Sequence, residues 1–470
     1  MSLTRGGRII VRRTSGGISG IRRWWQVCGG GILAAAVLSA GHALPAQAAS
    51  TRDDIVQVDL GVDGTQPDNW SEARGISADG RYGLFASLAS NLVPGDTNRL
   101  YDVFVRDLRT GRTERISVAD DGSQLEGSTS EAAISGDGRY VAFSSDAPGV
   151  VPGQPADSAW KIFVRDRRTG RTELVTSGTR NVTSGTRNAE SPAISEDGRY
   201  VTYTSDRRDI YVTDRWKGTT RLVTAGTDGS RADSDSTDPV ISAEGAVIGF
   251  RSKATNLLPH DQAPAAQPRE AGAAPAKEGV APPPGPALAG PKPPPSRRAF
   301  PFYAYDARTG RIQGASIDSA GVLRDALPDA TLSPDGRYAM FRVYEPGGTD
   351  EGGSHIELYV RDLRQGTTVK AGLPLPGTRT VRESYRGSMT VDNRWVVFGS
   401  DADNLVLGDT NQAADIFRRD LRTGRTERIS MTGAALESPW FPGTLSVDGR
   451  GGTALLGAGG KVFARRLPAA

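Results

Sequence analysis

The chain has 470 residues, a formal net charge of +3 and a single cysteine. Six arginines occur before residue 24 with no acidic residue among them. Removing them takes the net charge from +3 to −3, so the rest of the chain has no positive field to attract nucleic acid or an anionic membrane, and we exclude both as partners. The single cysteine, Cys28, lies just after these arginines, and the remainder of the chain can form no disulfide.

The first 48 residues have the features of a signal peptide. An arginine-rich start is followed by an apolar run over residues 27–41 and by Ala46-Gln47-Ala48, which is typical of a cleavage site. We expect cleavage after Ala48 and a protein that is secreted, periplasmic or associated with the cell envelope. Paired arginines leave twin-arginine export open beside the ordinary Sec route. After residue 48, no apolar stretch approaches the ~20 residues that span a bilayer.

A short unit is repeated seven times between residues 53 and 467, which predicts a single repeat domain. In each copy an apolar segment leads into an acidic residue followed by Gly, or by Asn in one copy, and then into a second apolar segment. The seven turns centre on Asp79-Gly80, Asp137-Gly138, Asp197-Gly198, Glu244-Gly245, Asp335-Gly336, Asp392-Asn393 and Asp448-Gly449. Asp accepts hydrogen bonds in tight turns and Gly supplies a left-handed residue, so we interpret the repeated acid as a turn residue rather than a catalytic one.

One interval between successive turns is longer than the others. The spacings are 58, 60, 47, 91, 57 and 56 residues, and the interval of 91 contains residues 263–298. This stretch is rich in Pro, Ala and Gly and cannot bury a core, so we expect a disordered insertion within the fourth repeat.

Each repeat contains four short segments with the composition of strands. In the second repeat they cover residues 132–135, 140–144, 161–166 and 172–176. The two middle segments are apolar on both faces, as strands between stacked sheets must be, whereas the fourth alternates and belongs at an exposed edge. The pattern predicts an all-β fold, a β-propeller of seven four-stranded blades, with six or eight blades left open.

The two ends of the repeat region complement each other. Residues 55–58 resemble a fourth strand that lacks the first three, and residues 444–464 supply three strands that lack a fourth. We therefore predict that the N-terminal strand completes the last blade and closes the ring.

The run Leu332-Ser333-Pro334-Asp335-Gly336-Arg337, followed by residues 357–362, resembles the WD40-like (PD40) repeats of TolB-type propellers. The resemblance covers roughly residues 53–467 and implies the propeller fold. It implies no particular activity, because propellers host many functions. TolB is similar only in part, since its six-bladed ring and separate N-terminal domain have no counterpart here, so its partners are not carried over.

The sequence contains no recognisable catalytic motif. A Gly-x-Ser-x-Gly elbow is missing after residue 48, as are the HExxH and CxxC spacings of metal sites. The two histidines beyond the signal peptide, His260 and His355, lie in expected loops. We therefore expect no enzyme, no catalytic residue and no cofactor-binding residue.

A polar segment occurs twice and offers oxygen ligands that would suit calcium. Residues 91–98, ending at an aspartate four residues later, recur as residues 404–411. The candidate ligands are Asp96, Asn98, Asp102, Asp409, Asn411 and Asp415. Neither copy continues as an EF-hand loop, and hydrogen bonding within Asx turns is the alternative that we favour, so we expect no metal and keep Ca²⁺ as an open alternative.

Arginines follow the turns at regular positions and predict a solvated surface of mixed charge rather than an anion site. They are Arg81, Arg139, Arg199, Arg337, Arg394 and Arg450.

Loop variation predicts where binding occurs and what kind of function it serves. The uniform turns share one face of a propeller, and the variable loops lie on the other, so we expect binding on the loop-bearing face. The sequence favours a secreted, monomeric, non-enzymatic propeller that binds a protein or a cell-envelope polymer. The alternative is a hydrolase or lyase that acts on glycans or peptides through loop carboxylates.

Overall fold

The computed structural model describes residues 55–155, 157–176, 188–205, 208–259, 300–346, 354–378, 383–410, 413–430 and 444–468. The chain divides into two compact units, Met1–Ala49 and Ser50–Ala470, and the described residues belong to the second. The expected signal peptide at residues 1–48 and the insertion at residues 263–298 lie outside the described residues, as do Cys28 and His260. Within the described ranges, no helix is long and apolar enough to cross a membrane.

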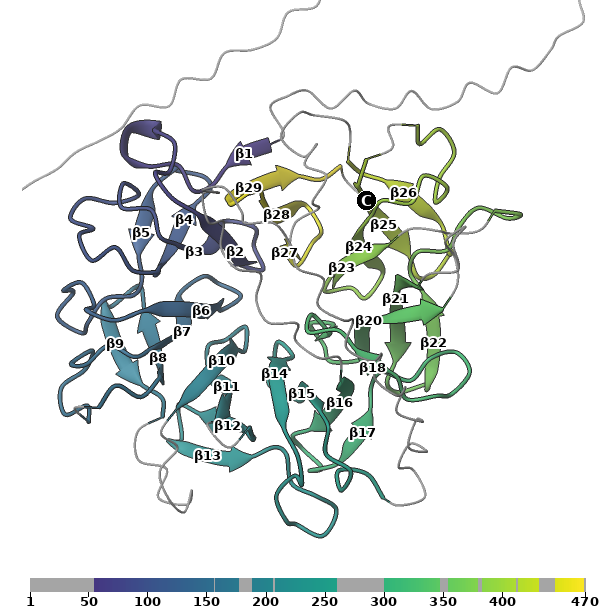
Figure 1. The fold of residues 1–470 in the computed structure, drawn as a ribbon, viewed down its shortest axis with the longest axis horizontal. Coiled ribbons are helices and arrows are strands. Elements are labelled where there is room, and N and C mark those ends of the chain that lie inside the picture. Colours follow the sequence, from purple (N-terminus) through teal and green to yellow (C-terminus); the bar gives the residue numbers. More distant parts are fainter. Residues whose placement is uncertain are drawn as a thin grey trace, which may run out of the picture. The chain divides into compact units, whose positions relative to one another are not determined.

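The second unit is a seven-bladed β-propeller (Figure 1), as the repeats predict. In the first six blades the strands of an antiparallel sheet follow one another in chain order from the central channel outwards. The first four blades contain β2 (Ser71–Ile76), β3 (Tyr82–Ser87), β4 (Asp102–Asp107) and β5 (Thr113–Arg115); β6 (Thr129–Ile134), β7 (Tyr140–Ser145), β8 (Lys161–Asp166) and β9 (Arg171–Leu174); β10 (Ala189–Ile194), β11 (Tyr200–Ser205), β12 (Ile210–Asp214) and β13 (Thr219–Leu222); and β14 (Ser236–Ile241), β15 (Val247–Ser252), β16 (Phe300–Asp306) and β17 (Ile312–Gly314).

The last three blades follow the same plan, with one long hairpin in the fifth. They contain β19 (Thr331–Leu332), β20 (Tyr338–Pro346), β21 (Ser354–Asp362) and β22 (Thr367–Lys370); β23 (Ser384–Met389), β24 (Trp395–Ser400), β25 (Asp415–Asp420) and β26 (Thr426–Arg428); and β27 (Thr444–Val447), β28 (Thr453–Ala458), β29 (Lys461–Arg466) and β1 (Ile55–Gln57). A short strand, β18 (Asp325–Ala326), also pairs with β16, and the described residues include one 3-10 helix, η2 (Val62–Gly64).

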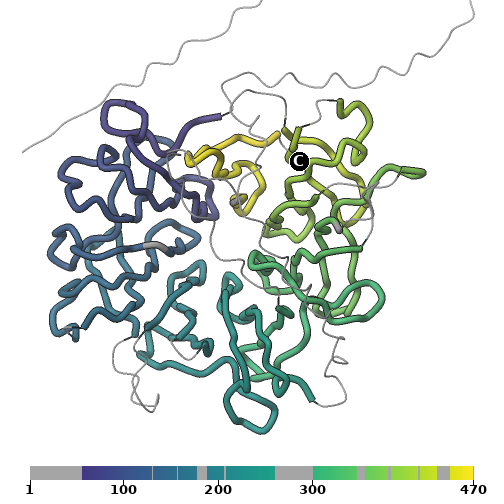
Figure 2. The backbone as a smooth tube through the Cα atoms, viewed as in Figure 1, coloured from purple at the N-terminus to yellow at the C-terminus, as the bar shows by residue number. Residues whose placement is uncertain are grey.

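The seventh blade is completed by the N-terminal strand, which confirms the predicted closure. β1 pairs antiparallel with β29, with Val56 opposite Ala464. In Figure 2 the purple start of the propeller accordingly lies beside its yellow end. This pairing covers a sheet edge that would otherwise be exposed, and it closes the ring without a covalent bond.

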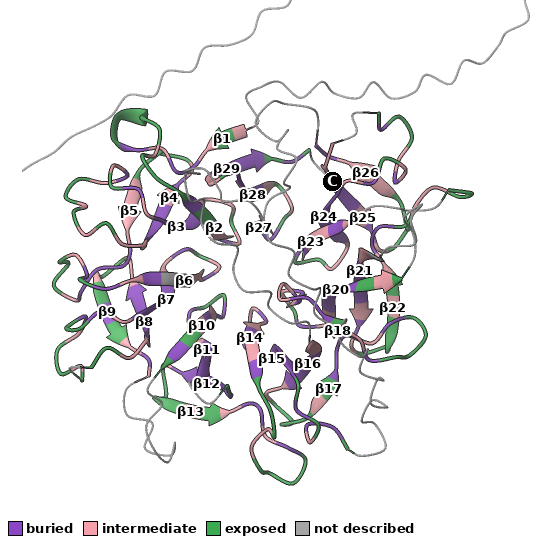
Figure 3. Cartoon of the chain, in the orientation of Figure 1, coloured by how far each residue is buried: buried purple, intermediate pink, exposed green. Residues whose placement is uncertain are grey.

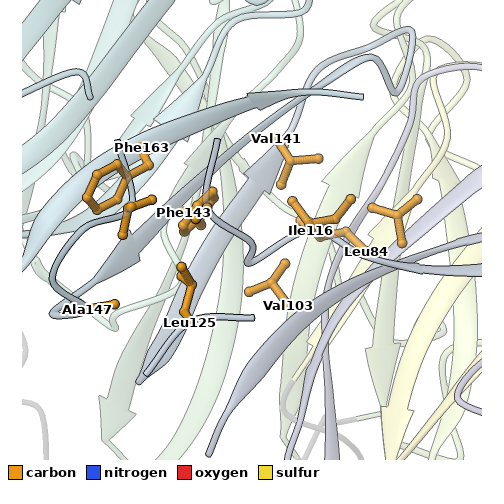
Figure 4. Close-up of a cluster of buried hydrophobic side chains, with 11 residues drawn as sticks. Leu84, Val103, Ile116, Leu125, Val141, Phe143, Ala147 and Phe163 are labelled. Carbon is orange, nitrogen blue, oxygen red and sulfur yellow. The ribbon is translucent and has the colours of Figure 1, made fainter. Parts of the chain in front are cut away.

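Apolar side chains between facing sheets hold the blades together. Between the first two blades, Leu84, Val103 and Ile116 pack in one cluster with Val141 and Phe143 (Figure 4). In six blades an aromatic ring of the second strand also stacks on one of the third, with centroids 5.5 to 5.9 Å apart. Figure 3 shows the middle strands buried and outer strands such as β9 and β13 largely exposed, as their apolar patterns predict.

In five of the first turns the acidic residue accepts hydrogen bonds from the turn itself, which confirms that it is a turn residue there. Asp79 Oδ1 accepts bonds from Ser77 Oγ (2.5 Å) and from the backbone N–H of Arg81 (3.0 Å). Gly80 follows with a φ of 72°, in the left-handed region that favours glycine. The same pair of bonds recurs at Asp137, Asp197, Asp335 and Asp392.

The seventh turn differs by two residues from the register that the sequence predicts. Gly451, rather than Gly449, has the left-handed conformation (φ 71°), and its N–H donates to Asp448 O (3.0 Å). Asp448 therefore takes the place that serine has in other turns, and Arg450 takes the place of the acidic residue. The predicted Asp448-Gly449 turn is wrong in register because glycine is present at both candidate positions.

In five blades the arginine after the first turn joins the two hairpins of the blade. Arg81 Nη2 lies 2.7 Å from Asp107 Oδ2, and Arg139 Nη2 lies 2.6 Å from Asp166 Oδ2. Hydrogen bonds from these arginines lower the pKa of Asp107 and Asp166 to about 2. Equivalent pairs are Arg199–Asp214, Arg337–Asp362 and Arg394–Asp420. The predicted mixed-charge surface is thus an ordered set of ion pairs, and Arg450 does not belong to it.

Candidate functional site

The two faces of the propeller differ in the connections that they carry. The turn face carries the turns between first and second strands and between third and fourth strands. The loop face carries the loops between second and third strands and the connections from blade to blade. Each first strand lines the channel and runs from the loop face to the turn face, so the same seven strands shape both ends of the channel (Figure 1).

At the turn face, backbone hydrogen bonds link the innermost turns of neighbouring blades around the channel. The donors and acceptors are Ala78 N to Gly136 O, Gly136 N to Glu196 O, Glu196 N to Ala243 O, Ala243 N to Pro334 O, Val391 N to Gly449 O and Gly449 N to Ala78 O, at 2.7 to 2.9 Å. The seventh link is missing because Pro334 has no N–H. There, Asn393 Nδ2 donates instead to Asp335 Oδ2 (2.8 Å).

Directly above this backbone ring, each blade contributes one aliphatic side chain to the channel wall. The seven residues are Ile76, Ile134, Ile194, Ile241, Leu332, Met389 and Val447, and they line a cavity of about 270 Å³. Polar residues, among them Glu196 and Ser333, line the same cavity. The seven aliphatic side chains and the ring of backbone hydrogen bonds narrow the channel towards the turn face.

A second cavity of about 630 Å³ opens on the turn face beside the first three blades. Its lining includes Asp79, Asp137, Asp197, Glu196 and Arg450. The three aspartates already accept bonds within their own turns. Burial, with a contribution from the nearby Glu244, raises the pKa of Glu196. The three aspartates of this lining are thus turn residues. Glu196 is the acidic side chain of the lining that does not belong to the repeated turn pattern.

At the loop-face end, the first strands carry β-bulges. The pairing with the second strand shifts register in five blades, at β2, β6, β10, β14 and β23. In two of them the bulged residue is left-handed, Ser191 with a φ of 54° and Asp238 with a φ of 51°. Bulges redirect side chains and occur next to active sites, and strained non-glycine residues are also concentrated there.

Charged side chains gather at these bulges, and we call them the channel cluster. The cluster consists of Arg74, Asp238, Arg251, Asp329, Arg342 and Arg386. Arg251 pairs with Asp238, and Arg342 Nε lies 2.6 Å from Asp329 Oδ2. Arg386 interacts electrostatically with groups from three other blades, namely Arg74, Asp238 and the Asp329–Arg342 pair. Five of these residues lie on first or second strands and Asp329 lies just before the first strand β19, so the interactions run across the channel.

Arg386 is the least neutralised cation of the cluster. Its Nε is 3.7 Å from Asp329 Oδ2, an oxygen that Arg342 already occupies, and its side chain is 38% exposed. The pKa of the Arg386 guanidinium is lowered by the protein packed around its partly exposed side chain and by the like charges of Arg342 and Arg74, while Asp329 and Asp238 act in the opposite direction. Arg74 has Glu72 at 2.7 Å as its partner. The channel thus presents a guanidinium group with donors left over for an anion.

Asp329 is the buried carboxylate of the cluster. Its side chain is 4% exposed, and its Oδ1 has no hydrogen-bond partner among the described residues. A buried carboxylate oxygen without a partner is costly, and such groups are concentrated at sites with a chemical role. Sequence reasoning missed the whole cluster. The signal that could have found it was a charged residue within a short first strand, as in Arg74, Asp238 and Arg386.

The calcium candidates are held by arginines instead of being open ligands. Arg115 Nη1 lies 3.5 Å from Asp96 Oδ1 and 3.7 Å from Asp102 Oδ2, while Asn98 Nδ2 donates to Asp102 Oδ2 (3.1 Å). In the second copy, Arg428 Nη1 lies 2.7 Å from Asp409 Oδ1 and 3.5 Å from Asp415 Oδ2. Asn411 lies outside the described residues. A cation is thus already present between each pair of carboxylates.

Asp102 and Asp415 belong to a repeated buried motif that the sequence did not predict. Each begins a third strand and accepts a bond from a hydroxyl after the fourth strand, Ser117 and Ser430 respectively. In the fifth blade Glu357 takes this position, near Lys370 (3.5 Å) and His355 (3.8 Å), and burial raises its pKa. His355 is therefore part of a buried blade contact. Among the described residues, no group of three or more His, Cys, Asp or Glu side chains could hold a metal ion.

Comparisons with known proteins relate the fold to solved propellers. No family model matches the sequence, and no curated protein matches it. An oligogalacturonate lyase in complex with manganese aligns with a TM-score of 0.50 and 10% identity, over 88% of this chain and 93% of its own. The oligogalacturonate lyase of Vibrio parahaemolyticus has the same score and identity, over 88% and 96%. A putative TolB from Agrobacterium tumefaciens reaches a TM-score of only 0.35 at 15% identity, over 64% of this chain and 80% of its own.

At 10% identity the two lyases show the fold alone. They contradict the expectation that the protein is not an enzyme, because the same architecture occurs in two proteins that are named as enzymes. The interpretation as a non-enzymatic scaffold is therefore wrong. The resemblance to TolB-type propellers is supported as far as the β-propeller itself.

Proposed function

We propose that the protein is a lyase that cleaves an acidic glycan, a polymer whose sugar rings carry carboxylates, at the loop-face end of its channel. The observation that carries this proposal is the channel cluster, in which the incompletely paired Arg386 lies beside the buried Asp329. Two solved structures with this fold are lyases of an acidic sugar polymer, oligogalacturonate, and they support the choice of reaction class.

The guanidinium groups account for substrate binding in this proposal. A carboxylate on a sugar ring is planar and accepts two parallel hydrogen bonds, which matches the fork of an arginine. Arg386 would supply these donors, and Arg74 lies close enough to add to the positive potential that Arg386 experiences. In a channel wall of low dielectric, such a contact is stronger than on an open surface.

The reaction that follows is a β-elimination. Arginine neutralises the sugar carboxylate and so makes the neighbouring C–H bond more acidic. Asp329 Oδ1 accepts that proton, the electron pair of the broken C–H bond forms a C=C bond, and the C–O bond to the leaving sugar breaks. The leaving oxygen takes up a proton from water, and the hydroxide that remains takes the proton from Asp329 and restores its carboxylate. Arg342 holds Asp329 through its other oxygen, 2.6 Å away, and thereby fixes the base in position.

Manganese is not part of this proposal. It is named for one of the fold neighbours. The described residues of this chain offer no cluster of carboxylate, imidazole or thiol groups that fits such an ion. We therefore derive no step through a metal.

Turnover of defined oligosaccharides tests the proposal. The chain without its expected signal peptide is incubated with oligogalacturonates, other uronate-containing oligomers and neutral oligomers, and unsaturated products are measured by ultraviolet absorbance and mass. Arg386→Ala and Asp329→Asn are expected to lower turnover by roughly 100-fold or more, while both variants melt near the wild-type temperature. Arg308→Ala, at an exposed turn, is the matched control and should keep full activity.

Two outcomes would contradict the proposal. One is the absence of unsaturated products from every acidic oligomer, and the other is a product that has gained water, which would indicate hydrolysis. Arg386→Lys separates charge from geometry, because lysine keeps the positive charge and loses the paired donors.

The family and the location of the protein are proposals as well. We place the chain with WD40-like (PD40) repeat propellers on the strength of the recurring Ser-x-Asp-Gly-Arg turns. We propose export through the N-terminal segment, so that the substrate is a polymer outside the cytoplasm, and we propose that the protein acts as a monomer. N-terminal sequencing of the exported protein tests cleavage after Ala48.

A further inference from the structure

Trp70 is an exposed aromatic side chain on the loop face. It directly precedes β2, the first strand that also carries Arg74, and its side chain is 50% exposed. A single exposed aromatic side chain is ordinary on a protein surface, so the way it is held and what lies beside it decide whether it can bind a ligand. The function proposed above does not use this residue.

The backbone and the indole of Trp70 are both fixed. Its carbonyl accepts bonds from Leu88 N (3.0 Å) and Ser87 Oγ (3.0 Å), and the next residue, Ser71, donates to Gly460 O (2.8 Å). The indole lies on Gly460, where a Cβ would be 2.5 Å from Trp70 Cε3. This close approach requires glycine at that position.

The result is a flat ring that is supported on one side and open on the other. Gly460 belongs to the turn between β28 and β29, so the support comes from the blade next to that of Trp70. A supported indole loses little conformational freedom when a ligand packs on it, because its rotamer is already set. Its open face carries the negative potential of an aromatic ring, which attracts the C–H groups on the flat side of a sugar.

The distance along β2 relates this platform to the channel cluster. Arg74 is the fourth residue after Trp70, which at about 3.3 Å per residue corresponds to roughly 13 Å. A sugar ring on the indole would thus be separate from the ring whose carboxylate binds in the channel. An oligomer lying along β2 would contact both.

We infer that Trp70 is a sugar-stacking subsite that lets the enzyme distinguish longer oligosaccharides from shorter ones. This inference rests on the proposed function. It adds the requirement that the glycan extends from the channel across the loop face towards the seventh blade.

Steady-state kinetics on a length series of acidic oligosaccharides test the inference. Trp70→Ala is expected to lower kcat/KM for the longer oligomers by about tenfold through KM, with kcat unchanged. The shortest oligomer that is cleaved should be unaffected. Trp70→Phe should recover part of the loss, because a smaller ring still stacks. Trp216→Ala is the matched control, since Trp216 is 63% exposed on the turn face, and it should change nothing.

Binding separates this inference from the proposed function. If wild-type protein cleaves no acidic oligomer, the proposed function fails, and affinity for the same oligomers is then measured by calorimetry. In that case, a loss of affinity for long oligomers in Trp70→Ala would support the subsite. The inference would be overturned if Trp70→Ala lost the same affinity for oligomers of every length, or if it bound them as the wild-type protein does. It would also be overturned if the wild-type protein bound no oligosaccharide. Melting temperatures of the variants identify any general loss of folding.

Discussion

The turn face and the loop face are built from the same seven repeats, yet the copies agree closely at one face and diverge at the other. At the turn face, serine, acid, glycine and arginine recur with nearly the same hydrogen bonds from blade to blade. At the loop face, the third residue of the first strand is Ala73, Glu131, Ser191, Asp238 or Arg386 in different blades. Uniform residues indicate a shared structural task, and divergent residues in a strained strand indicate a site.

The largest expected difference between the faces concerns their glycines. Gly138 at the turn face and Gly153 in a loop of the same blade both have positive φ, 70° and 76°. A Cβ at Gly138 would lie 2.2 Å from Tyr82 Cδ2 of the neighbouring blade, whereas nothing lies within 4 Å of one at Gly153. We expect Gly138→Ala to cost about 3 kcal/mol and Gly153→Ala about 1 kcal/mol in denaturant unfolding. Equal costs would show that the turns do not lock the blades together.

Acid should weaken the turn face through its arginine–aspartate pairs. The pKa of Asp107 and of Asp166 is about 2 in the folded protein, below the ordinary 3.8, so both carboxylates bind protons more readily when the chain is unfolded. Their contribution is fully present above about pH 4 and is lost as the pH falls towards about 2. Free energies of unfolding measured across this window should decline, and less steeply in Asp107→Asn.

Asp306 provides the matched control for the acid experiment. It begins the equivalent second turn of the fourth blade, where the position of the turn arginine is occupied by Ala246. Asp306→Asn should therefore leave the decline unchanged. If the free energy of unfolding of Asp107→Asn falls with pH as steeply as that of the wild-type protein, the turn-face ion pairs do not cause the acid sensitivity.

The smallest expected effect concerns metal removal at the loop face. Arg115 and Arg428 lie between the carboxylates that the sequence offered to calcium. We therefore expect that a chelator shifts the melting temperature by less than the error of the measurement. If the chelator lowers the melting temperature and added calcium restores it, these carboxylates bind calcium and the expectation is wrong.

Local patterns in the sequence determine much of the fold. Asp-Gly turns and apolar segments are short-range signals, and seven repetitions of them predicted the blades and the closing pair of β1 and β29. The same signals failed at Asp448-Gly449, where a second glycine two residues later made two registers equally acceptable. They also gave no partner for Arg81, because Asp107 is distant in sequence and adjacent only after the blade folds.

The candidate site was invisible to sequence reasoning for a related physical reason. Arg74, Asp238, Asp329 and Arg386 belong to four blades, and each one alone resembles an ordinary charge on or beside a strand. Their meeting depends on closure of the ring and on bulges that turn side chains towards the channel. The sequence by itself determined the repeating unit, because turns and strand patterns depend on neighbouring residues. Only the tertiary structure decided which charges face one another, because that depends on the curvature that brings distant blades together.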